Sequence, residues 1–477
     1  MAHSSREFSR VAAVALRDER VQANLLSLYN GFHQGRQREA DATPNWEEIR
    51  DRARAIKART VENLDFYLEL LERSVTGAGG RVFFATDAEA ANRYVLDLAR
   101  LKGVRTVIKG KSMLSEEMGL NQRLSQEGIE AVETDLGEYI IQLAEERPYH
   151  IIVPAIHKSR EEVSLLLHNK LGVPRHQDIP EMAGEARRQL RDKFIQAEMG
   201  ITGANFVVAE TGTLVLVTNE GNGRMCTSMP KTHVAIMGME KIVPTMEDLG
   251  IFLRLLIRSA TGQRISSYVT MVDGPRRSDD EDGPEEFHLV VVDNGRSRLL
   301  ADPELRESLY CLRCGACLNA CPVYRKVGGH AYGWVYPGPI GAIVSPMLTS
   351  LSSLRDLPYA SSLCGACREV CPVRINTPRM LLHLRRELTE GGTHLKGSTS
   401  SLAERLVMKA LRLTMASPFM LAMATKLGRV FQWPLQRKGG LTMLPPPLSG
   451  WTKHRDLRPI ASSPFRERWR KYLEHQS

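Results

Sequence analysis

The sequence predicts an α/β protein followed by a smaller, cysteine-rich module. From residue 81 onward, short apolar runs alternate with helical stretches of about ten to fifteen residues, the pattern of βαβ units in a largely parallel sheet. Farther along, seven of the eight cysteines fall within residues 311–371. With 477 residues, the chain is long enough for about three domains.

Residues 1–80 are expected to form an N-terminal helical region, because they lack strand-like alternation and are rich in helix-forming residues. In the segment 46–71, apolar side chains recur at helical spacing, at Ile49, Ala53, Ile56, Val61, Leu64 and Leu68. This segment is predicted to lie in one long helix that ends at the glycine-rich break 77–80.

Residues 81–295 are predicted to form one α/β domain. Its first half should contain strands at 82–85, 106–108, 130–132 and 151–153, and helices at 87–101, 137–146, 160–171 and 181–198. Its second half is richer in strands, with two strands over 204–218 around the turn 210–212 and further strands at 232–237, 267–272 and 287–292.

Two short motifs in this domain carry residues that could do chemistry. Lys109-Gly-Lys111-Ser112 follows a predicted strand and precedes a helix, so it could bind an anion at the helix N-terminus. We favour the alternative, a strand-to-helix turn with Ser112 as its N-cap. Glu210-Thr-Gly-Thr213 could place a carboxylate at a strand end for substrate chemistry or form a hairpin turn with a solvated glutamate, and the sequence does not decide between the two.

The other polar residues of the strand-rich half do not form a recognisable catalytic set. Asn222, Arg224 and His233 are interpreted as structural, because single residues of these types usually are. Cys226 is expected to be a small buried side chain rather than a ligand. The sequence has no dinucleotide-binding glycine fingerprint in a strand-to-helix context, so the catalytic residues stay unknown.

The cysteine-rich module, residues 296–390, contains two related cysteine runs. The first, Cys311-Leu-Arg-Cys314-Gly-Ala-Cys317-Leu-Asn-Ala-Cys321-Pro322, has the ferredoxin spacing C-x2-C-x2-C-x3-C-P. The second, Cys364-Gly-Ala-Cys367-Arg-Glu-Val-Cys371-Pro372, is the same run without its first cysteine, and Ser361 stands at that position.

In two-cluster ferredoxins, the fourth cysteine of such a run binds the other cluster. Applied here, this rule predicts one iron–sulfur cluster bound by Cys311, Cys314, Cys317 and Cys371, and a second bound by Cys321, Cys364 and Cys367. Zinc is the main alternative, but zinc sites usually use two C-x2-C pairs and do not call for this register followed by Cys-Pro. We therefore predict two unequal clusters, the second of which can convert from [4Fe–4S] to [3Fe–4S].

Two segments of the module lie outside the cysteine runs. A glycine-rich loop at 328–341 either lets the backbone approach a cluster or a docking surface closely or is an ordinary irregular loop. A helix is expected before the first run, near 303–310, and another at 378–389 after the second run.

Residues 391–477 are predicted to form a linker and a basic, amphipathic C-terminal region. They contain 15 Lys and Arg against 4 Asp and Glu, a net charge of +11, so residues 1–390 carry 9 − 11 = −2. The Leu- and Met-rich segment 402–431 has no uncharged run near the ~20 residues that cross a bilayer. We expect docking to an acidic partner first, contact with an anionic membrane surface second, and no nucleic-acid binding, because no nucleic-acid motif accompanies the charge.

The start of the chain shows no secretory signal, because residues 1–20 are polar and lack an apolar core. Reduced, metal-binding cysteines without such a signal are typical of the cytoplasm. We therefore expect a cytoplasmic protein, with a peripheral position at the membrane surface as the second option.

Four features together resemble the lactate-utilisation (LUD) domain family, in its iron–sulfur branch: the sequence 109–113, the sequence 209–213, the four-plus-three cysteine pattern and the basic tail. The resemblance implies a LUD domain similar to the sugar-isomerase and CoA-transferase α/β fold, followed by a helical ferredoxin-like domain with two [4Fe–4S] clusters. It also implies a three-protein system that oxidises L-lactate to pyruvate and allows growth on lactate.

Within such a system, the resemblance implies that this chain is an iron–sulfur electron-transfer component. Its expected partners are the other lactate-utilisation subunits, with the basic tail meeting an electron-acceptor protein or the membrane surface. The alternative is a metabolite-binding LUD protein whose clusters are structural or redox-sensing. Whether the LUD domain is itself catalytic is left open at this point.

Overall fold

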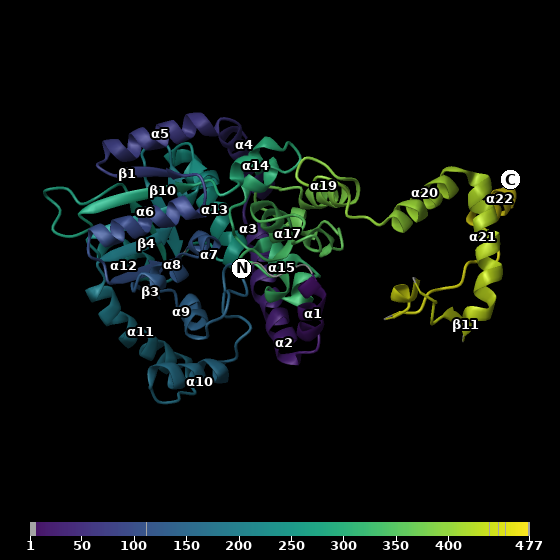
Figure 1. Cartoon of the computed structure of the whole chain (residues 1–477), viewed down its shortest axis with the longest axis horizontal. Coiled ribbons are helices and arrows are strands. Elements are labelled where there is room, and N and C mark those ends of the chain that lie inside the picture. The colour runs from purple at the N-terminus through teal and green to yellow at the C-terminus, as the bar shows by residue number, and fades with distance from the viewer. Residues whose placement is uncertain (1–5, 111, 438, 447, 454, 476–477) are drawn as a thin grey trace. The chain divides into compact units, whose positions relative to one another are not determined.

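The structure is a computed structural model that describes residues 6–110, 112–437, 439–446, 448–453 and 455–475 (Figure 1). The chain divides into two compact units, Met1–Gly397 and Ser398–Ser477. The first unit contains the α/β domain and the cysteine-rich module.

The N-terminal region is helical, as predicted. Its helices are α1 (Arg6–Ala15), α2 (Glu19–Leu28), α3 (Gln34–Ala42), α4 (Trp46–Glu62) and α5 (Leu64–Gly77), with a π-helical turn at Tyr29–His33. The prediction of one long helix is wrong, because the helix breaks at Asn63. There the backbone leaves helical geometry (φ −120°, ψ 40°), and the Asn63 side chain donates a hydrogen bond of 2.8 Å to the Arg59 carbonyl.

The α/β domain is built on a six-stranded sheet in which every neighbouring pair is parallel, which confirms the predicted fold class. The strand order is β1 (Arg81–Ala85), β10 (Glu286–Val292), β7 (Thr232–Gly238), β4 (Met199–Gly203), β2 (Thr106–Gly110) and β3 (Glu130–Glu133). On β2, next to the edge strand β3, Ile108 pairs with both Gly200 and Val132. The central strands are almost wholly buried, as their continuous apolar runs require.

Helices cover both faces of this sheet (Figure 1). One apolar layer contains α6 (Ala88–Leu101), α7 (Met113–Met118) and α8 (Leu120–Gln126). The opposite layers contain α5, α9 (Leu136–Leu143), α11 (Ile179–Gln196) and α12 (Asn222–Ser228), and α10 (Arg160–Leu171) packs beside α9 and α11.

A second, four-stranded sheet has the order β8 (Ile242–Val243), β5 (Phe206–Val208), β6 (Leu214–Thr218) and β9 (Tyr268–Val272). Strands β5 and β6 are antiparallel, which confirms the predicted pair of strands around 210–212. Helix α13 (Met246–Thr261) packs on this sheet, with the rings of Phe252 and Phe206 5.5 Å apart. Helix α14 (Arg296–Ala301) then leads to the cysteine-rich module.

The segment 151–153 is not a strand, so that prediction is wrong. The backbone N–H groups of Ile152 and Val153 donate to Nδ1 of His150, at 3.0 and 3.3 Å, instead of to a neighbouring strand. The apolar side chains of this loop pack toward the cysteine-rich module rather than into the parallel sheet. An apolar run of three residues cannot distinguish these two environments.

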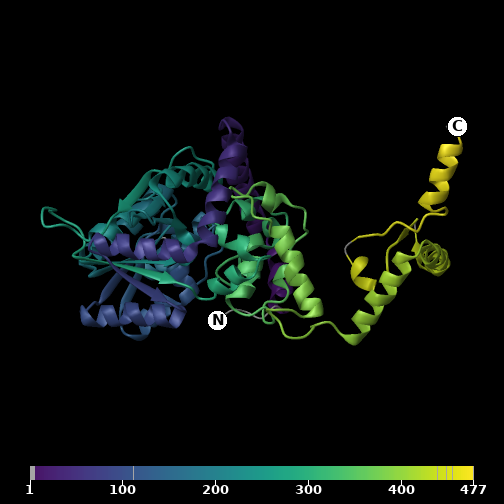
Figure 2. The ribbon, with the colours of Figure 1, turned by 90° about the horizontal axis from the view of Figure 1, so that it is seen from above.

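The cysteine-rich module is helical. Its elements are a 3-10 turn at Arg306–Tyr310, α15 (Ala316–Ala320), α16 (Tyr324–Val327), α17 (Gly338–Leu348), α18 (Ala366–Glu369) and α19 (Thr377–Glu390). The N-terminal helices α1 and α2 lie beside this module in both ribbon views (Figures 1 and 2), and α1 and α2 both contact α16. The module therefore shares one apolar core with the start of the chain.

The second unit contains α20 (Leu402–Ala416), α21 (Pro418–Gln432), α22 (Phe465–Glu474) and the short strands β11 (Gln436–Arg437) and β12 (Gly440–Leu441). Ser417 caps α21, whose first residue is Pro418, so the proline seen in the sequence separates two helices. Among the described residues, no single helix has the length and apolar character of a membrane span, although α20 and α21 together pass that test with a bend of 113° between them.

Candidate functional site

A small cavity of about 20 Å³ lies inside the cysteine-rich module, and five cysteines line it: Cys311, Cys314, Cys317, Cys367 and Cys371. Burial raises the pKa of Cys314 to about 12, and the neighbouring thiols of Cys371 and Cys311 raise it further. Burial likewise raises the pKa of Cys371 to about 11, with Cys311 acting in the same direction. These thiols ionise at neutral pH only with a metal to stabilise the thiolate.

The remaining cysteines form a second group around Cys321. Burial raises the pKa of Cys367 to about 11, and the thiols of Cys321 and Cys364 add to this effect. Cys364 is exposed, and the N–H of Ala366 and the hydroxyl of Ser362 lower its pKa. The second group therefore reaches the protein surface at Cys364, whereas no cysteine of the first group is exposed.

The two groups adjoin each other through Cys367. This residue lines the cavity of the first group, while the thiols that affect it most belong to the second. The assignment of individual ligands to two clusters stays a prediction, and this arrangement is compatible with it.

The cysteine sulfurs do not form a ready-made zinc site. A tetrahedral zinc ion with sulfur ligands at about 2.3 Å holds them about 3.8 Å apart. In the described part of the chain, no set of three or more potential ligand atoms within 4.8 Å of one another includes a cysteine.

The backbone of the second run repeats that of the first. Arg313 and Gly315, on either side of Cys314, have positive φ angles of 60° and 75°, and Leu363 and Gly365, on either side of Cys364, have 55° and 85°. The sulfur of Cys311 accepts a hydrogen bond from the N–H of Arg313 at 3.4 Å. The hydroxyl of Ser361 accepts the equivalent bond from the N–H of Leu363 at 3.1 Å. Ser361 therefore occupies the place of Cys311 in the repeat.

Three arginines of the N-terminal helices hold the turn that carries Cys371. Arg50 donates to the Cys371 carbonyl at 2.8 Å and to the Glu369 carbonyl at 2.6 Å. Arg36 and Arg54 donate to the carbonyls of Val370 and Arg374 at 3.2 and 2.9 Å. The three guanidinium groups lie beside the turn of Cys371, where their positive charge would offset the negative charge of cluster-bound thiolates. The N-terminal region is therefore part of the site.

The α/β domain contributes a much larger cavity, of about 820 Å³. It opens at the carboxyl ends of the parallel strands, where ligands of open α/β sheets bind. The residues that follow β2, β3, β4 and β7 line it, including Ser112, Asp135, Asn205 and Lys241. Ile151 and Arg313 line both this cavity and the small cysteine cavity, so the two sites share a wall.

The floor of the large cavity contains a buried ion network. Arg296 donates to both oxygens of Glu117 at 2.9 Å and to Glu240 at 2.8 Å, and the Tyr336 hydroxyl donates to Glu117 at 2.7 Å. Although burial opposes it, the charge of Arg296 and that of Arg313 hold the pKa of Glu240 at about 2. Burial lowers the pKa of Lys241, beside this network, to about 8. No sequence motif connects these residues, so the sequence does not indicate the network.

We expect Arg296→Met to lower the free energy of unfolding by about 3–5 kcal/mol, because it leaves two buried carboxylates without their main partner. Arg298→Met is the matched control, since Arg298 is exposed on the same helix and should change stability by less than about 0.5 kcal/mol. Urea unfolding followed by tryptophan fluorescence measures both. Equal losses in the two variants would show that the network does not stabilise the domain.

The Lys109–Ser112 motif forms the strand-to-helix turn that we favoured. Ser112 caps α7 by accepting a hydrogen bond from the Ser115 N–H at 3.1 Å. Lys109 is buried and pairs with Glu133 at 2.7 Å. Burial alone would lower the pKa of Lys109, but Glu133 and Glu116 outweigh it and raise the pKa above its usual range. Lys109 is thus not available to an anion, and Lys111 lies outside the described residues.

The second motif is a hairpin turn rather than a substrate site. Glu210 is exposed, and its carboxylate accepts a hydrogen bond from the Met246 N–H at 3.2 Å. The turn packs on α5, where the Ser74 hydroxyl donates to the Ala209 carbonyl at 2.8 Å. None of the residues 210–213 lines the large cavity. The alternative with a solvated glutamate is therefore confirmed.

Of the single polar residues of this half, His233 has a structural contact, as predicted, and the structural role of Asn222 and Arg224 stays a prediction. His233 is buried in the sheet beside Thr202 at 2.9 Å, and burial lowers its pKa to about 3. Arg224 is exposed. Cys226 is buried, with its pKa raised by burial to about 12. Asn222 is buried, and both polar atoms of its side chain lack a hydrogen-bond partner among the described residues.

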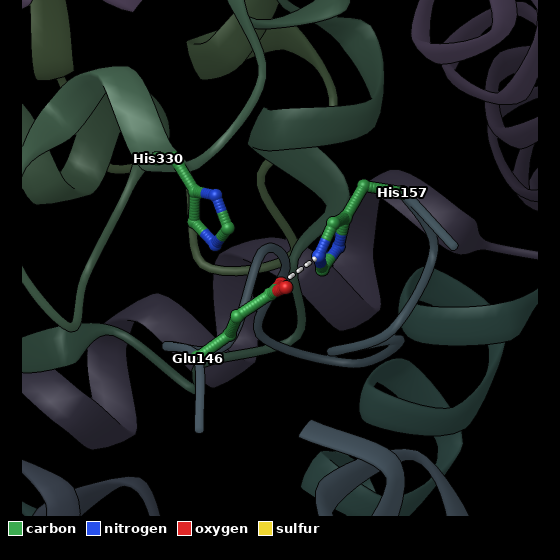
Figure 3. A group of neighbouring side chains, drawn as sticks. All are labelled: Glu146, His157 and His330. Atoms are coloured by element: carbon green, nitrogen blue, oxygen red, sulfur yellow. Dashed lines mark hydrogen bonds and ion pairs between the residues drawn. The ribbon is translucent and has the colours of Figure 1, made fainter. Parts of the chain in front are cut away.

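The glycine-rich loop 328–341 approaches the α/β domain at Gly329, and its Ile340 lines the cysteine cavity. A Cβ atom on Gly329 would lie 1.7 Å from the Tyr149 carbonyl oxygen, so only glycine fits there. Next to this contact, Glu146, His157 and His330 come together (Figure 3), with His157 Nε2 2.6 Å from the Glu146 carboxylate. Lys158 pairs with the other carboxylate oxygen. We interpret this group as a polar link between domain and module, because a cation already neutralises the carboxylate.

Comparison with known proteins shows similarity along almost the whole chain. Residues 68–292 match the LUD domain family model, residues 307–375 match a 4Fe-4S dicluster domain, and residues 383–473 match the C-terminal model of lactate utilisation protein B. The matched dicluster domain supports iron–sulfur clusters in the cysteine-rich module.

Several curated proteins are similar over most of their length. Lactate utilization protein B of Macrococcus caseolyticus is 44% identical, covering 96% of each chain. The protein of that name from Bacillus cytotoxicus is 44% identical over 99% of this chain and 98% of its own. An uncharacterized electron transport protein of Escherichia coli, YkgF, is 46% identical over 96% of this chain and 93% of its own.

Proposed function

The chain belongs to the lactate utilization protein B family, and from this premise we propose that it is the electron-transfer component of a multi-protein system that oxidises L-lactate to pyruvate. The names of the relatives support a role in lactate utilisation. The observation that carries the finer proposal is the pair of adjoining cysteine groups beside the cavity of the LUD domain.

Electron counting favours this role. Oxidation of L-lactate to pyruvate releases two electrons and two protons, whereas an iron–sulfur cluster accepts one electron at a time. A chain that holds two clusters can accept both electrons, and the contact through Cys367 supports transfer between the clusters. Because clusters do not accept hydride, a partner subunit or a bound organic group has to take part in the oxidation itself.

A titration with lactate tests the proposal. The chain and its partner subunits are purified without oxygen and mixed, and the EPR and visible spectra of the clusters are followed as L-lactate is added. We expect the clusters to become reduced only when the partners are present. Clusters that stay oxidised throughout would contradict electron transfer and favour the second candidate, a metabolite-binding protein with structural or redox-sensing clusters.

We further propose that the C-terminal unit docks an acidic surface of a partner subunit. Residues 398–477 contain 14 Lys and Arg against 4 Asp and Glu, a net charge of +10, and α20 contains no buried residue. Large apolar side chains are exposed along both long helices, among them Leu402 at 76%, Phe419 at 71% and Phe431 at 73%. Such a surface is suited to a partner or, as a second option, to an anionic membrane.

Deleting residues 401–477 should spare the clusters but weaken assembly with the partner subunits, because none of the seven cysteines lies in the deleted part. Co-purification of the partners measures assembly, and iron content measures the clusters. Binding to vesicles that contain anionic lipid distinguishes the membrane option. Unchanged co-purification would show that the tail does not dock the partners.

A further inference from the structure

The large cavity contains two cationic groups that the surrounding protein does not fully pair. Lys241 lines it, and in the part of the chain that the structure describes its ammonium group has neither a hydrogen bond nor an ion pair. Arg313 also lines it, and the Nη1 atom of this arginine is buried without a hydrogen-bond partner. A buried donor without an acceptor is costly, so this end of the cavity is suited to a ligand with acceptor oxygens.

Nearby carboxylates do not remove this positive charge. Glu117 and Glu240 are both held by Arg296 at 2.8–2.9 Å, whereas the Glu240 oxygen is 3.8 Å from Arg313. Three cations, Arg296, Arg313 and Lys241, thus face the two carboxylates of Glu117 and Glu240. One positive charge is left over at this end of the cavity. Three further carboxylates line the cavity, those of Asp135, Glu138 and Glu220; Asp135 caps α9, and Glu220 accepts the Leu136 N–H at 3.3 Å.

The rest of the cavity is larger and less polar than a three-carbon acid needs. Its volume of about 820 Å³ falls in the range of about 300–1,000 Å³ that holds drug-sized ligands. Ile151, Ile152 and Val153 line it on the side of the cysteine-rich module, and Val217 and Leu256 line it from the second sheet and α13. The cavity thus combines a cationic end at Lys241 and Arg313 with an apolar wall, and its acidic residues follow β3 and β6.

We propose that this cavity binds an organic anion, with its carboxylate or phosphate group held by Lys241 and Arg313 and its body against the apolar wall. The bound anion would lie next to the first cysteine group, because Arg313 and Ile151 belong to both cavities. This inference goes beyond electron transfer and does not depend on it, since binding is measured on the oxidised protein alone. The acidic group could belong to a hydroxy-acid or oxo-acid substrate or to a nucleotide-like redox cofactor.

Isothermal titration calorimetry of the oxidised, cluster-loaded full-length protein tests the proposal with three probes: L-lactate, pyruvate and flavin mononucleotide. We expect at least one probe to bind and Lys241→Met to weaken that binding about tenfold or more. Lys241→Arg should keep most of the affinity. Lys231→Met is the matched control, because Lys231 is 80% exposed and far from the cavity lining. Binding of the flavin alone indicates a phosphate-bearing cofactor, and binding of the small acids indicates a substrate site.

Iron content and thermal midpoint show whether each variant has folded, and Lys241→Gln replaces Lys241→Met if the latter has not. Failure of all three probes to bind the wild-type protein would overturn the proposal. The proposal would also be overturned if Lys241→Met and Lys231→Met both left the binding unchanged. Lys241 and Arg313 would then be counter-charges to the first cluster. Neither result would affect the lactate titration that tests electron transfer.

Discussion

Mild oxidation of the anaerobically prepared protein should produce a [3Fe–4S] EPR signal from the second cluster while the first cluster survives. The predicted ligands of the second cluster, Cys321, Cys364 and Cys367, leave one iron without a thiolate. Cys364 is also exposed, whereas Cys314 of the first group is buried. An iron with a weaker ligand at the protein surface is the one most easily lost.

Ser361→Cys should suppress this signal, because Ser361 occupies the place in the second run that Cys311 occupies in the first. Both side chains accept a hydrogen bond from the N–H two residues later. Ser362→Cys tests the neighbouring serine, whose exposed side chain interacts with Cys364. Suppression of the signal by Ser362→Cys alone would place residue 362, and not residue 361, at the open iron. If Cys364→Ser left the signal intact and Cys314→Ser abolished it, the labile cluster would belong to the other cysteines.

The second large effect is expected from Cys314→Ser. Cys314 is buried at the centre of the first group, so its loss should remove that cluster and about half of the bound iron. Cys226→Ser provides the control, because Cys226 is buried in the α/β domain against Thr134 at 3.3 Å and should retain all iron. Iron analysis of the two anaerobically purified variants measures the difference. Full iron in Cys314→Ser, or a loss in Cys226→Ser, would contradict the assignment.

The sequence predicted the sheet well where burial acts along a whole strand. The valine-rich run 287–292, which is apolar except for His288, indicates a buried strand, and β10 lies in the interior of the parallel sheet. The run 151–153 was too short for the same inference. In the structure its backbone N–H groups donate to the side chain of His150 rather than to a neighbouring strand. The break at Asn63 was also missed, since the apolar spacing continues across it.

The candidate site could likewise be predicted only in part: the cysteine groups could, and the large cavity could not. Cysteine spacing carries chemical information, so the sequence alone led to the prediction of two unequal clusters and to the position of Ser361 in the repeat. The matched dicluster domain supports the presence of iron–sulfur clusters, and their unequal ligation stays a prediction. The large cavity could not be predicted, because Lys241, Arg296 and Arg313 meet only after three separate segments fold together. Each follows a different element, and an isolated lysine or arginine in a sequence is usually a solvated surface residue. A signal that could have helped is the position of Lys241 just after a buried strand.

The central claim is that this chain holds two iron–sulfur clusters of unequal ligation. The most direct test is the iron and sulfide content of the anaerobically prepared protein together with its EPR spectrum before and after reduction. Two [4Fe–4S] clusters predict about eight iron and eight sulfide ions per chain and two reducible centres, one of which yields the [3Fe–4S] signal on mild oxidation. About four irons with one reducible centre, or zinc in place of iron, would contradict the claim.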